Sequence, residues 1–217
     1  GYKEVDFNEV ADIYIINTCT VTNTADNKSK KIIRQAINRN KDAIIVAVGC
    51  LVQNEKDIVN KIDGIDIVIG NKNKIKIVDY IEEYINNNRP IVEIKNPTNE
   101  FENMKITNFN KTRAFIKIQD GCNNYCSYCI IPYARGNVCS KKPSLVLKEA
   151  KELVSNGHQE IVLTGIHTGH YGSDLDNYDL SSLLEELLKI DGLKRIRISS
   201  IEITEITERL MNLFKNN

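Results

Sequence analysis

The 217-residue sequence lacks any apolar run that approaches the roughly 18–20 residues a membrane-spanning helix needs. Its start lacks the basic and then apolar segments of a signal peptide. It also lacks a charge imbalance, because Lys+Arg and Asp+Glu number 29 each, so net charge indicates no polyanionic partner. We therefore expect a cytoplasmic protein with no membrane partner and no DNA partner.

The sequence does not begin with Met and opens within a strand–helix pattern, so we expect further chain upstream. Its six cysteines do not indicate a disulfide scaffold, because such scaffolds are short and secreted. Three of the cysteines are clustered, and this grouping indicates metal ligands.

Strands and helices alternate along residues 1–88. Short β-rich apolar runs occur at 12–17, 43–48 and 65–69. They alternate with segments of helical periodicity at 22–39, 55–61 and 75–88. This order predicts an N-terminal α/β domain with a parallel sheet covered by helices. Residues 89–110 contain Pro90, Pro97 and several Asn without a sustained period, which indicates a linker.

A second alternation over residues 111–217 predicts three βα units. Strands are expected at 113–119, 160–164 and 194–199, and helices at 143–156, 179–190 and 205–214. Three units are too few to close a barrel, and they would leave an open edge strand. We therefore expect the first half of a (βα) partial barrel, with further chain downstream.

Cys122, Cys126 and Cys129 form a C-x3-C-x2-C motif just after the first strand of this second region. Gly121 allows the turn that a wrapping loop needs. Thiolates are soft ligands that suit iron–sulfur clusters or zinc. Because no fourth Cys or His follows at ligand spacing, the motif favours a 4Fe–4S cluster with one open iron. The alternative is a structural zinc site completed by a distant ligand, although such sites usually show paired C-x2-C motifs.

Cys19 and Cys50 each follow a predicted parallel strand directly. The ends of parallel strands meet at one edge of the sheet, where ligands gather. Two cysteines converging there indicate a second metal site. The alternative is a pair of buried core cysteines.

The C-x3-C-x2-C motif, with Tyr128 just before its third cysteine, resembles the radical S-adenosylmethionine (SAM) superfamily. With Cys19 and Cys50 added, the pattern resembles the methylthiotransferases of that superfamily. The resemblance implies a SAM-binding 4Fe–4S cluster on Cys122, Cys126 and Cys129, with Tyr128 near the adenine. It also implies an auxiliary 4Fe–4S cluster on Cys19, Cys50 and a third cysteine upstream.

The segments 17–23 (Asn-Thr-Cys-Thr-Val-Thr-Asn), 120–136 and 164–167 (Thr-Gly-Ile-His) resemble most the branch that acts on threonylcarbamoyladenosine in tRNA. The resemblance implies addition of a methylthio group to carbon 2 of that nucleoside, next to the anticodon. The implied partners are the tRNA anticodon region and an electron donor such as flavodoxin or ferredoxin. Alternatives are the isopentenyladenosine-tRNA branch, the ribosomal-protein aspartate branch, and a zinc-stabilised RNA-binding module.

Further cofactor contacts are expected where the later strands end. They are Thr164, Gly165 and His167 after the second strand, and Ser200 and Glu202 after the third. The alternatives are a core-edge histidine at His167 and a helix cap with a solvated carboxylate at Ser200 and Glu202. Cys139 and Ile203 depart from the family pattern, which commonly has a basic residue and Pro at those positions.

Basic residues on the first helix and at Lys141-Lys142 form two candidate tRNA phosphate contacts, or else simply face solvent. We expect the 217-residue chain to be inactive alone, because the auxiliary site lacks a ligand and the barrel wall is incomplete.

Overall fold

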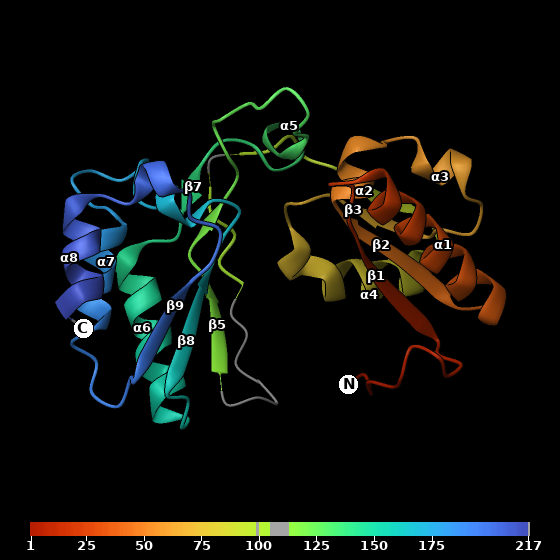
Figure 1. The fold of residues 1–217 in the computed structure, drawn as a ribbon. Helices are drawn as coiled ribbons and strands as arrows, with labels where there is room; N and C mark the ends of the chain where they lie inside the picture. Colours follow the sequence, from red (N-terminus) through yellow and green to blue (C-terminus); the bar gives the residue numbers. More distant parts are fainter. Residues whose placement is uncertain (99, 105–112, 217) are drawn as a thin grey trace. The chain divides into compact units, whose positions relative to one another are not determined.

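A computed structural model describes residues 1–98, 100–104 and 113–216. Contacts divide the chain into a first unit, Gly1–Pro97 with Cys126–Arg135, and a second unit, Thr98–Tyr125 with Gly136–Asn217 (Figure 1). The predicted domain limits of 1–88, 89–110 and 111–217 remain a prediction, and residues 99 and 105–112 lie outside the described part. Within the described part of the chain, no helix is long and apolar enough to cross a membrane.

The first unit contains a four-stranded parallel sheet. Its strands follow one another in the order β1 (Ile13–Thr18), β2 (Ile44–Gly49), β3 (Ile67–Ile69) and β4 (Ile91–Glu93). Ile and Val dominate these strands, because branched side chains pack well on a pleated surface buried on both faces. The register pairs Thr18 with Gly49, so β1 and β2 end at the same level.

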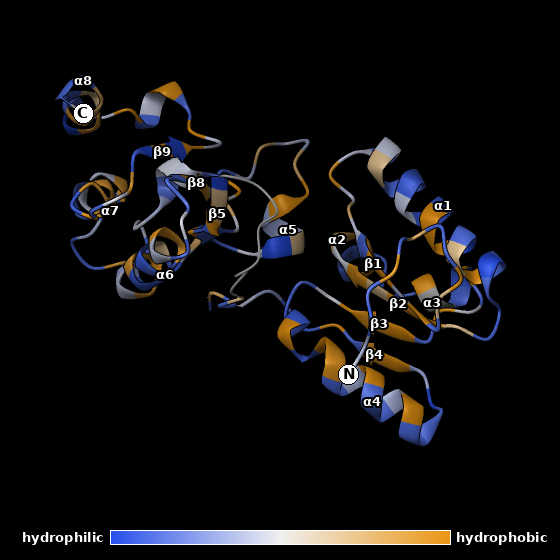
Figure 2. Ribbon diagram, turned by 90° about the horizontal axis from the view of Figure 1, so that it is seen from below, coloured by the Kyte–Doolittle hydropathy of each residue, from blue (hydrophilic) through white to orange (hydrophobic). Residues whose placement is uncertain are grey.

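Helices cover both faces of this sheet. They are α1 (Asn23–Arg39), α2 (Cys50–Asn54), α3 (Ile58–Lys61) and α4 (Ile77–Asn87), which follows the 3-10 turn η1 (Lys74–Lys76). Ile45 and Ala47 of β2 pack in one core with α1, and the alternate residues Val46 and Val48 pack in another with α4. Figure 2 shows the apolar strands between α1 and α4.

The helices of this unit lie near the predicted ranges, with two differences. Thr22 caps α1, because its hydroxyl accepts a hydrogen bond of 3.1 Å from the Ala25 amide. The helix predicted over 55–61 begins later, at Ile58, and α2 was not predicted. The residues of α2 are buried almost all round, so the segment lacks the one-sided periodicity that marks an exposed helix.

The second unit contains a three-stranded parallel sheet with helices on one face (Figure 1). The sheet order is β5 (Arg113–Lys117), β8 (Glu160–Thr164) and β9 (Arg195–Ile198), and the covering helices are α6 (Pro143–Ser155), α7 (Leu180–Leu187) and α8 (Glu208–Asn216). The helix predicted over 205–214 begins at Glu208, because the 3-10 turn η3 (Ile203–Glu205) precedes it. A second 3-10 turn, η2 (Thr168–His170), follows β8.

Alternation along β5 shows which face is the core. Ala114 and Ile116 are fully buried against α6 and α7, whereas Arg113, Phe115 and Lys117 are exposed on the other face. β5 therefore buries only one of its faces, whereas three consecutive residues of the central strand β8 are buried.

A short antiparallel ribbon closes the cysteine loop at its base. It pairs β6 (Gln119–Asp120) with β7 (Cys139–Ser140). Lys141 follows β7 and is buried in an ion pair with Glu149 of α6. The predicted phosphate contact at Lys141-Lys142 is therefore wrong for Lys141, whose ammonium group is directed to a carboxylate inside the protein.

Candidate functional site

The three strands of the second unit end at one edge, and each leads into a segment that carries predicted site residues. β5 leads to Gln119 and Cys122, β8 to Gly165 and His167, and β9 to Ser200 and Glu202. Because parallel strands place their carboxyl ends together, the predicted convergence of these segments is confirmed.

Gln119 links the first two of these segments. Its side chain is fully buried. The amide nitrogen donates hydrogen bonds of 2.8 Å to the Asp120 carbonyl and 2.7 Å to the Gly121 carbonyl. The amide oxygen accepts one of 2.9 Å from the His167 backbone N–H. A single side chain therefore fixes the entry to the cysteine loop against the turn after β8.

Gly165 makes this link sterically feasible. A Cβ at position 165 would lie 2.8 Å from the Gln119 amide oxygen and 3.1 Å from Thr168 Cγ2. Gly165 therefore has a packing role that the sequence did not show, and its predicted cofactor contact remains a prediction. Thr164 likewise has a structural partner, since its hydroxyl donates to the Ile116 carbonyl at 3.3 Å.

Cys122 is buried at the start of the cysteine loop. Its sulfur accepts a hydrogen bond of 3.5 Å from the Asn124 amide and lies 4.0 Å from His167 Nδ1. Gly121 adopts φ +69°, and a Cβ there would collide with the Asn137 carbonyl, so the predicted glycine turn is confirmed. An amide donor to the sulfur is a common surrounding of a metal-ligating cysteine.

The rest of the motif belongs to the first unit. Cys126 is exposed and Cys129 is half-buried, and the Cys129 amide donates to the Cys126 carbonyl at 2.9 Å. Tyr128, between them, is 91% exposed. The short helix α5 (Ile131–Arg135) follows and packs on α2.

Cys19 and Cys50 stand one residue beyond the paired ends of β1 and β2, so their predicted placement at one sheet edge is confirmed. Cys19 is exposed, and its backbone N–H donates to Ser29 Oγ at 3.1 Å. Cys50 is buried, with its sulfur 3.5 Å from Asn71 Nδ2. The same Asn71 nitrogen donates to the Ala134 carbonyl at 2.7 Å, which ties α5 to the Cys50 site.

The last two predicted contacts follow β9. Ser200 adopts a left-handed φ of +53°, an uncommon conformation for a residue with a Cβ. The Glu202 side chain is 66% exposed, with Oε1 3.8 Å from His167 Nε2. A strained backbone and a solvent-facing carboxylate at the edge of the sheet are compatible with ligand contact.

The donor set of the chain fits iron–sulfur chemistry. None of the six cysteines, all of which lie in the described part of the chain, forms a disulfide bond. The three in the motif include one buried sulfur that already accepts an amide hydrogen bond and one exposed sulfur open to solvent. Soft thiolates with amide donors are the usual surroundings of such clusters.

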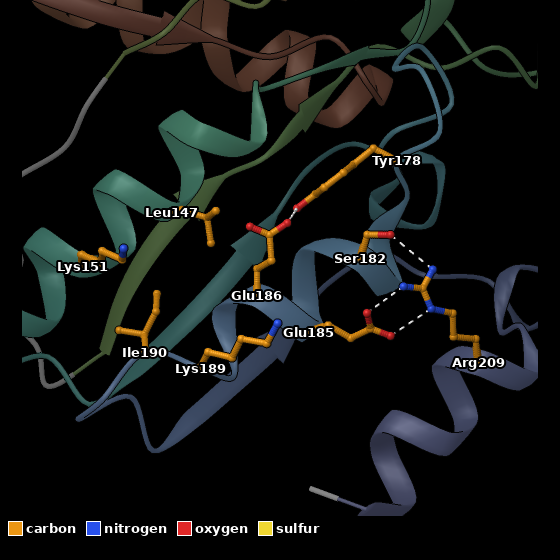
Figure 3. A pocket seen from close by; sticks show the side chains of 9 residues that line it. All are labelled: Leu147, Lys151, Tyr178, Ser182, Glu185, Glu186, Lys189, Ile190 and Arg209. Atoms are coloured by element: carbon orange, nitrogen blue, oxygen red, sulfur yellow. Dashed lines mark hydrogen bonds and ion pairs between the residues drawn. The ribbon is translucent and has the colours of Figure 1, made fainter.

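A separate cleft lies among the outer helices of the second unit. Figure 3 shows its lining side chains from α6, α7 and α8, among them Glu185, Glu186 and Arg209. Arg209 donates to Glu185 at 2.7 Å, and Tyr178 donates to Glu186 at 2.7 Å. Within the described chain, this cleft includes none of the predicted site residues, and Glu185, Glu186 and Arg209 already take part in side-chain hydrogen bonds.

Comparisons with known proteins agree with this site. Residues 1–70 match the family described as Uncharacterized protein family UPF0004, and residues 116–217 match the Radical SAM superfamily. The second match contains the whole C-x3-C-x2-C motif. Fold and site thus define a chain with the domain features of radical SAM enzymes.

Curated relatives indicate which kind of radical SAM enzyme the chain resembles. The chain is 46% identical over 217 residues to the threonylcarbamoyladenosine tRNA methylthiotransferase MtaB of Bacillus subtilis, covering 98% of the chain and 48% of the relative. It is 40% identical over 216 residues to MtaB of Aquifex aeolicus, covering 98% and 52%. It is 34% identical over 219 residues to a tRNA-2-methylthio-N(6)-dimethylallyladenosine synthase of Clostridium novyi, covering 97% and 48%. The chain spans about half the length of these relatives, and its predicted resemblance to the methylthiotransferases is confirmed.

Solved structures show the fold. The chain is similar to the radical SAM methyltransferase TsrM of Kitasatospora setae, with a TM-score of 0.53 at 15% identity, covering 82% of this chain and 41% of that one. A second structure of TsrM gives a TM-score of 0.52 at 16% identity, covering 80% and 39%. The predicted fold class, a parallel α/β domain followed by a partial (βα) barrel, is confirmed.

Sequence reasoning missed four residues of this site, namely Gln119, Asn71, Asn124 and Glu205. Their roles depend on partners that are distant in sequence or on backbone groups, neither of which leaves a local pattern. Gln119 does not stand out in the sequence, because the predicted strand over 113–119 also contains the polar residues Arg113 and Lys117.

Proposed function

We propose that the protein acts as a tRNA methylthiotransferase that adds a methylthio group to carbon 2 of N6-threonylcarbamoyladenosine next to the anticodon. The observation that carries this proposal is the presence of two thiol sites in one chain. One is the motif of Cys122, Cys126 and Cys129 beyond β5, and the other is Cys19 and Cys50 beyond the in-register ends of β1 and β2.

The first thiol site is proposed to hold the SAM-binding 4Fe–4S cluster, which when bound supplies the electron that cleaves SAM. Gln119 and Gly121 set the backbone of the loop, and Asn124 donates its amide to the Cys122 sulfur. The second site is proposed to hold the auxiliary 4Fe–4S cluster, with Cys19 and Cys50 as two of its three thiolates.

SAM itself is proposed to lie against the strand ends of the partial barrel and the cysteine loop. The contacts are Tyr128, Thr164, Gly165, His167, Ser200 and Glu202. Tyr128 offers an exposed aromatic face for an adenine, and Glu202 offers an exposed carboxylate for an amino group or a ribose hydroxyl. The hydroxyl of Thr164 and the backbone at Gly165 line the end of β8.

The choice of substrate follows the identities of the relatives. The MtaB proteins of Bacillus subtilis and Aquifex aeolicus are 46% and 40% identical to the chain, against 34% for the dimethylallyladenosine synthase of Clostridium novyi. The proposed partners are therefore the tRNA anticodon region and an electron donor such as flavodoxin or ferredoxin, in the cytoplasm.

A bacterial host that lacks its own threonylcarbamoyladenosine methylthiotransferase provides the test. The whole gene that encodes this chain, including any flanking coding sequence, is expressed there, and tRNA nucleosides are measured by liquid chromatography and mass spectrometry. We expect methylthio-threonylcarbamoyladenosine with the native gene and with Cys139→Ala, a control at a buried cysteine outside both thiol sites. Cys126→Ala is expected to abolish the product.

Metal analysis separates the classes of function. After anaerobic reconstitution, a 4Fe–4S site on the motif adds about four irons with matching sulfide, and Cys126→Ala removes them. Methylthio-isopentenyladenosine in the host tRNA would move the proposal to the sister branch. Zinc in place of iron, with no new nucleoside, would refute an enzyme of this kind and leave an RNA-binding module.

A further inference from the structure

Two imidazoles and a carboxylate converge beyond the ends of β8 and β9. His167 Nε2 lies 2.8 Å from Glu205 Oε1, and His170 Nε2 lies 2.9 Å from the same oxygen. The two rings stand 4.2 Å apart between centroids. Each residue thus offers one ligand-type atom, and these atoms lie within 4.8 Å of one another in a group that contains no thiol.

The buried atoms of this cluster are not satisfied by hydrogen bonds. The His167 side chain is 8% exposed and that of Glu205 is 11% exposed. Within the described residues, neither His167 Nε2 nor Glu205 Oε1 has a hydrogen-bond partner of acceptable geometry, despite the short separation. Buried polar atoms without a partner are rare in native proteins and point to an ion or another missing group.

The surroundings hold these three groups in place. Glu205 Oε2 accepts the Glu202 backbone N–H at 3.0 Å, which leaves Oε1 directed to the histidines. His167 is anchored by its backbone N–H on Gln119, and its Nδ1 lies 3.4 Å from Asn124 Nδ2. Gly169 leaves the necessary space, because a Cβ there would collide with the Glu205 carboxylate.

We propose that His167, His170 and Glu205 bind one divalent transition-metal ion, zinc or ferrous iron, separate from the thiol sites. Two His and one carboxylate form a ligand set used by both ions. Ligand atoms about 2.1 Å from one ion are about 3.4 Å apart around a tetrahedral ion and about 3.0 Å apart around a six-coordinate one. The two nitrogen–oxygen separations of 2.8 and 2.9 Å are nearer to the six-coordinate value. The ion would fasten η2 to η3, and so hold together the ends of β8 and β9 that carry the proposed SAM contacts.

Cobalt(II) serves as the probe, added anaerobically to the protein after iron and sulfide have been reconstituted and the thiols that hold no cluster have been alkylated. We expect one cobalt per chain beyond the iron, with visible d–d bands and no thiolate charge-transfer band. His170→Ala and Glu205→Gln are expected to weaken binding at least ~10-fold. His158→Ala, the same change at the remaining histidine of the chain, is expected to bind as the native protein does.

Zinc provides a second readout that depends on the folded state. Added zinc should raise the unfolding temperature of the native protein and of His158→Ala, but not that of His170→Ala. Glu205 also caps η3, so His170→Ala is the decisive variant if Glu205→Gln fails to fold. Absence of cobalt binding, a thiolate band, or native affinity in His170→Ala would each overturn the proposal. The iron and sulfide contents report on the thiol site independently.

Discussion

The buried ion pair of Lys141 and Glu149 allows a quantitative test of how the cysteine loop is attached to the barrel wall. The two side chains are 3% and 6% exposed, so neither charge is hydrated. Lys141→Met removes the cation and leaves the carboxylate buried alone. Loss of one partner of such a pair costs about 3–5 kcal/mol, whereas replacing both by apolar groups is often neutral. We therefore expect Lys141→Met to lower the free energy of unfolding by about 3–5 kcal/mol.

The double variant Lys141→Met/Glu149→Leu is expected to recover most of that loss, to within about 1–2 kcal/mol of the native protein. The chain contains no Trp, so urea unfolding is followed by tyrosine near-UV circular dichroism. Tyr171 is a suitable reporter, since it is buried and its hydroxyl donates to the Lys141 carbonyl at 2.8 Å. A single variant as stable as the native protein, or a double variant as unstable as the single one, would refute the reasoning.

Three further predictions concern individual contacts. Gln119→Leu leaves the His167 amide and two carbonyls without its hydrogen bonds, and should cost about 2–4 kcal/mol in urea unfolding; a loss under about 1 kcal/mol would count against the link. The Asp66 carboxylate, 2.5 Å from the Tyr84 hydroxyl, and then burial raise the pKa of Tyr84 from 10.0 to about 12. This contribution to stability is complete below pH 10 and lost as the pH rises to about 12. The pKa values of Tyr80, Tyr171 and Tyr178 are raised as well, so ultraviolet titration should show several late tyrosines, of which Tyr84→Phe removes the one near pH 12. Gly169→Ala should displace Glu205 and weaken cobalt binding at least ~10-fold without changing iron content.

The strands of the two parallel sheets could be predicted because most of them are short Ile- or Val-rich runs, and Gly49, Gly70 and Gly165 stand at the ends of three of them. The cap at Thr22 and the helix start at Pro143 likewise follow from local chemistry. The two thiol sites could be located because spacing and strand ends are properties of the sequence itself.

Other features could not be predicted because they depend on distant partners. Gln119 meets the His167 amide 48 positions away, and Asn71 meets the Ala134 carbonyl 63 positions away. Lys141 resembles its solvent-facing neighbour Lys142 until tertiary structure places Glu149 against it. Glu205 was expected within a helix, and only the 3-10 turn directs its side chain toward the histidines.

The link made by Gln119 bears on attempts to imitate this motif in miniature. A synthetic peptide of the C-x3-C-x2-C segment would keep the three thiols but lose the amide of His167 that holds its first turn. A backbone residue that is free in the peptide loses about 1–2 kcal/mol of conformational entropy when it is fixed in one conformation, and cluster insertion would have to offset this cost. In the folded chain, pairing of β8 with β5 provides that order beforehand, so a peptide mimic should capture iron far less tightly than the whole protein.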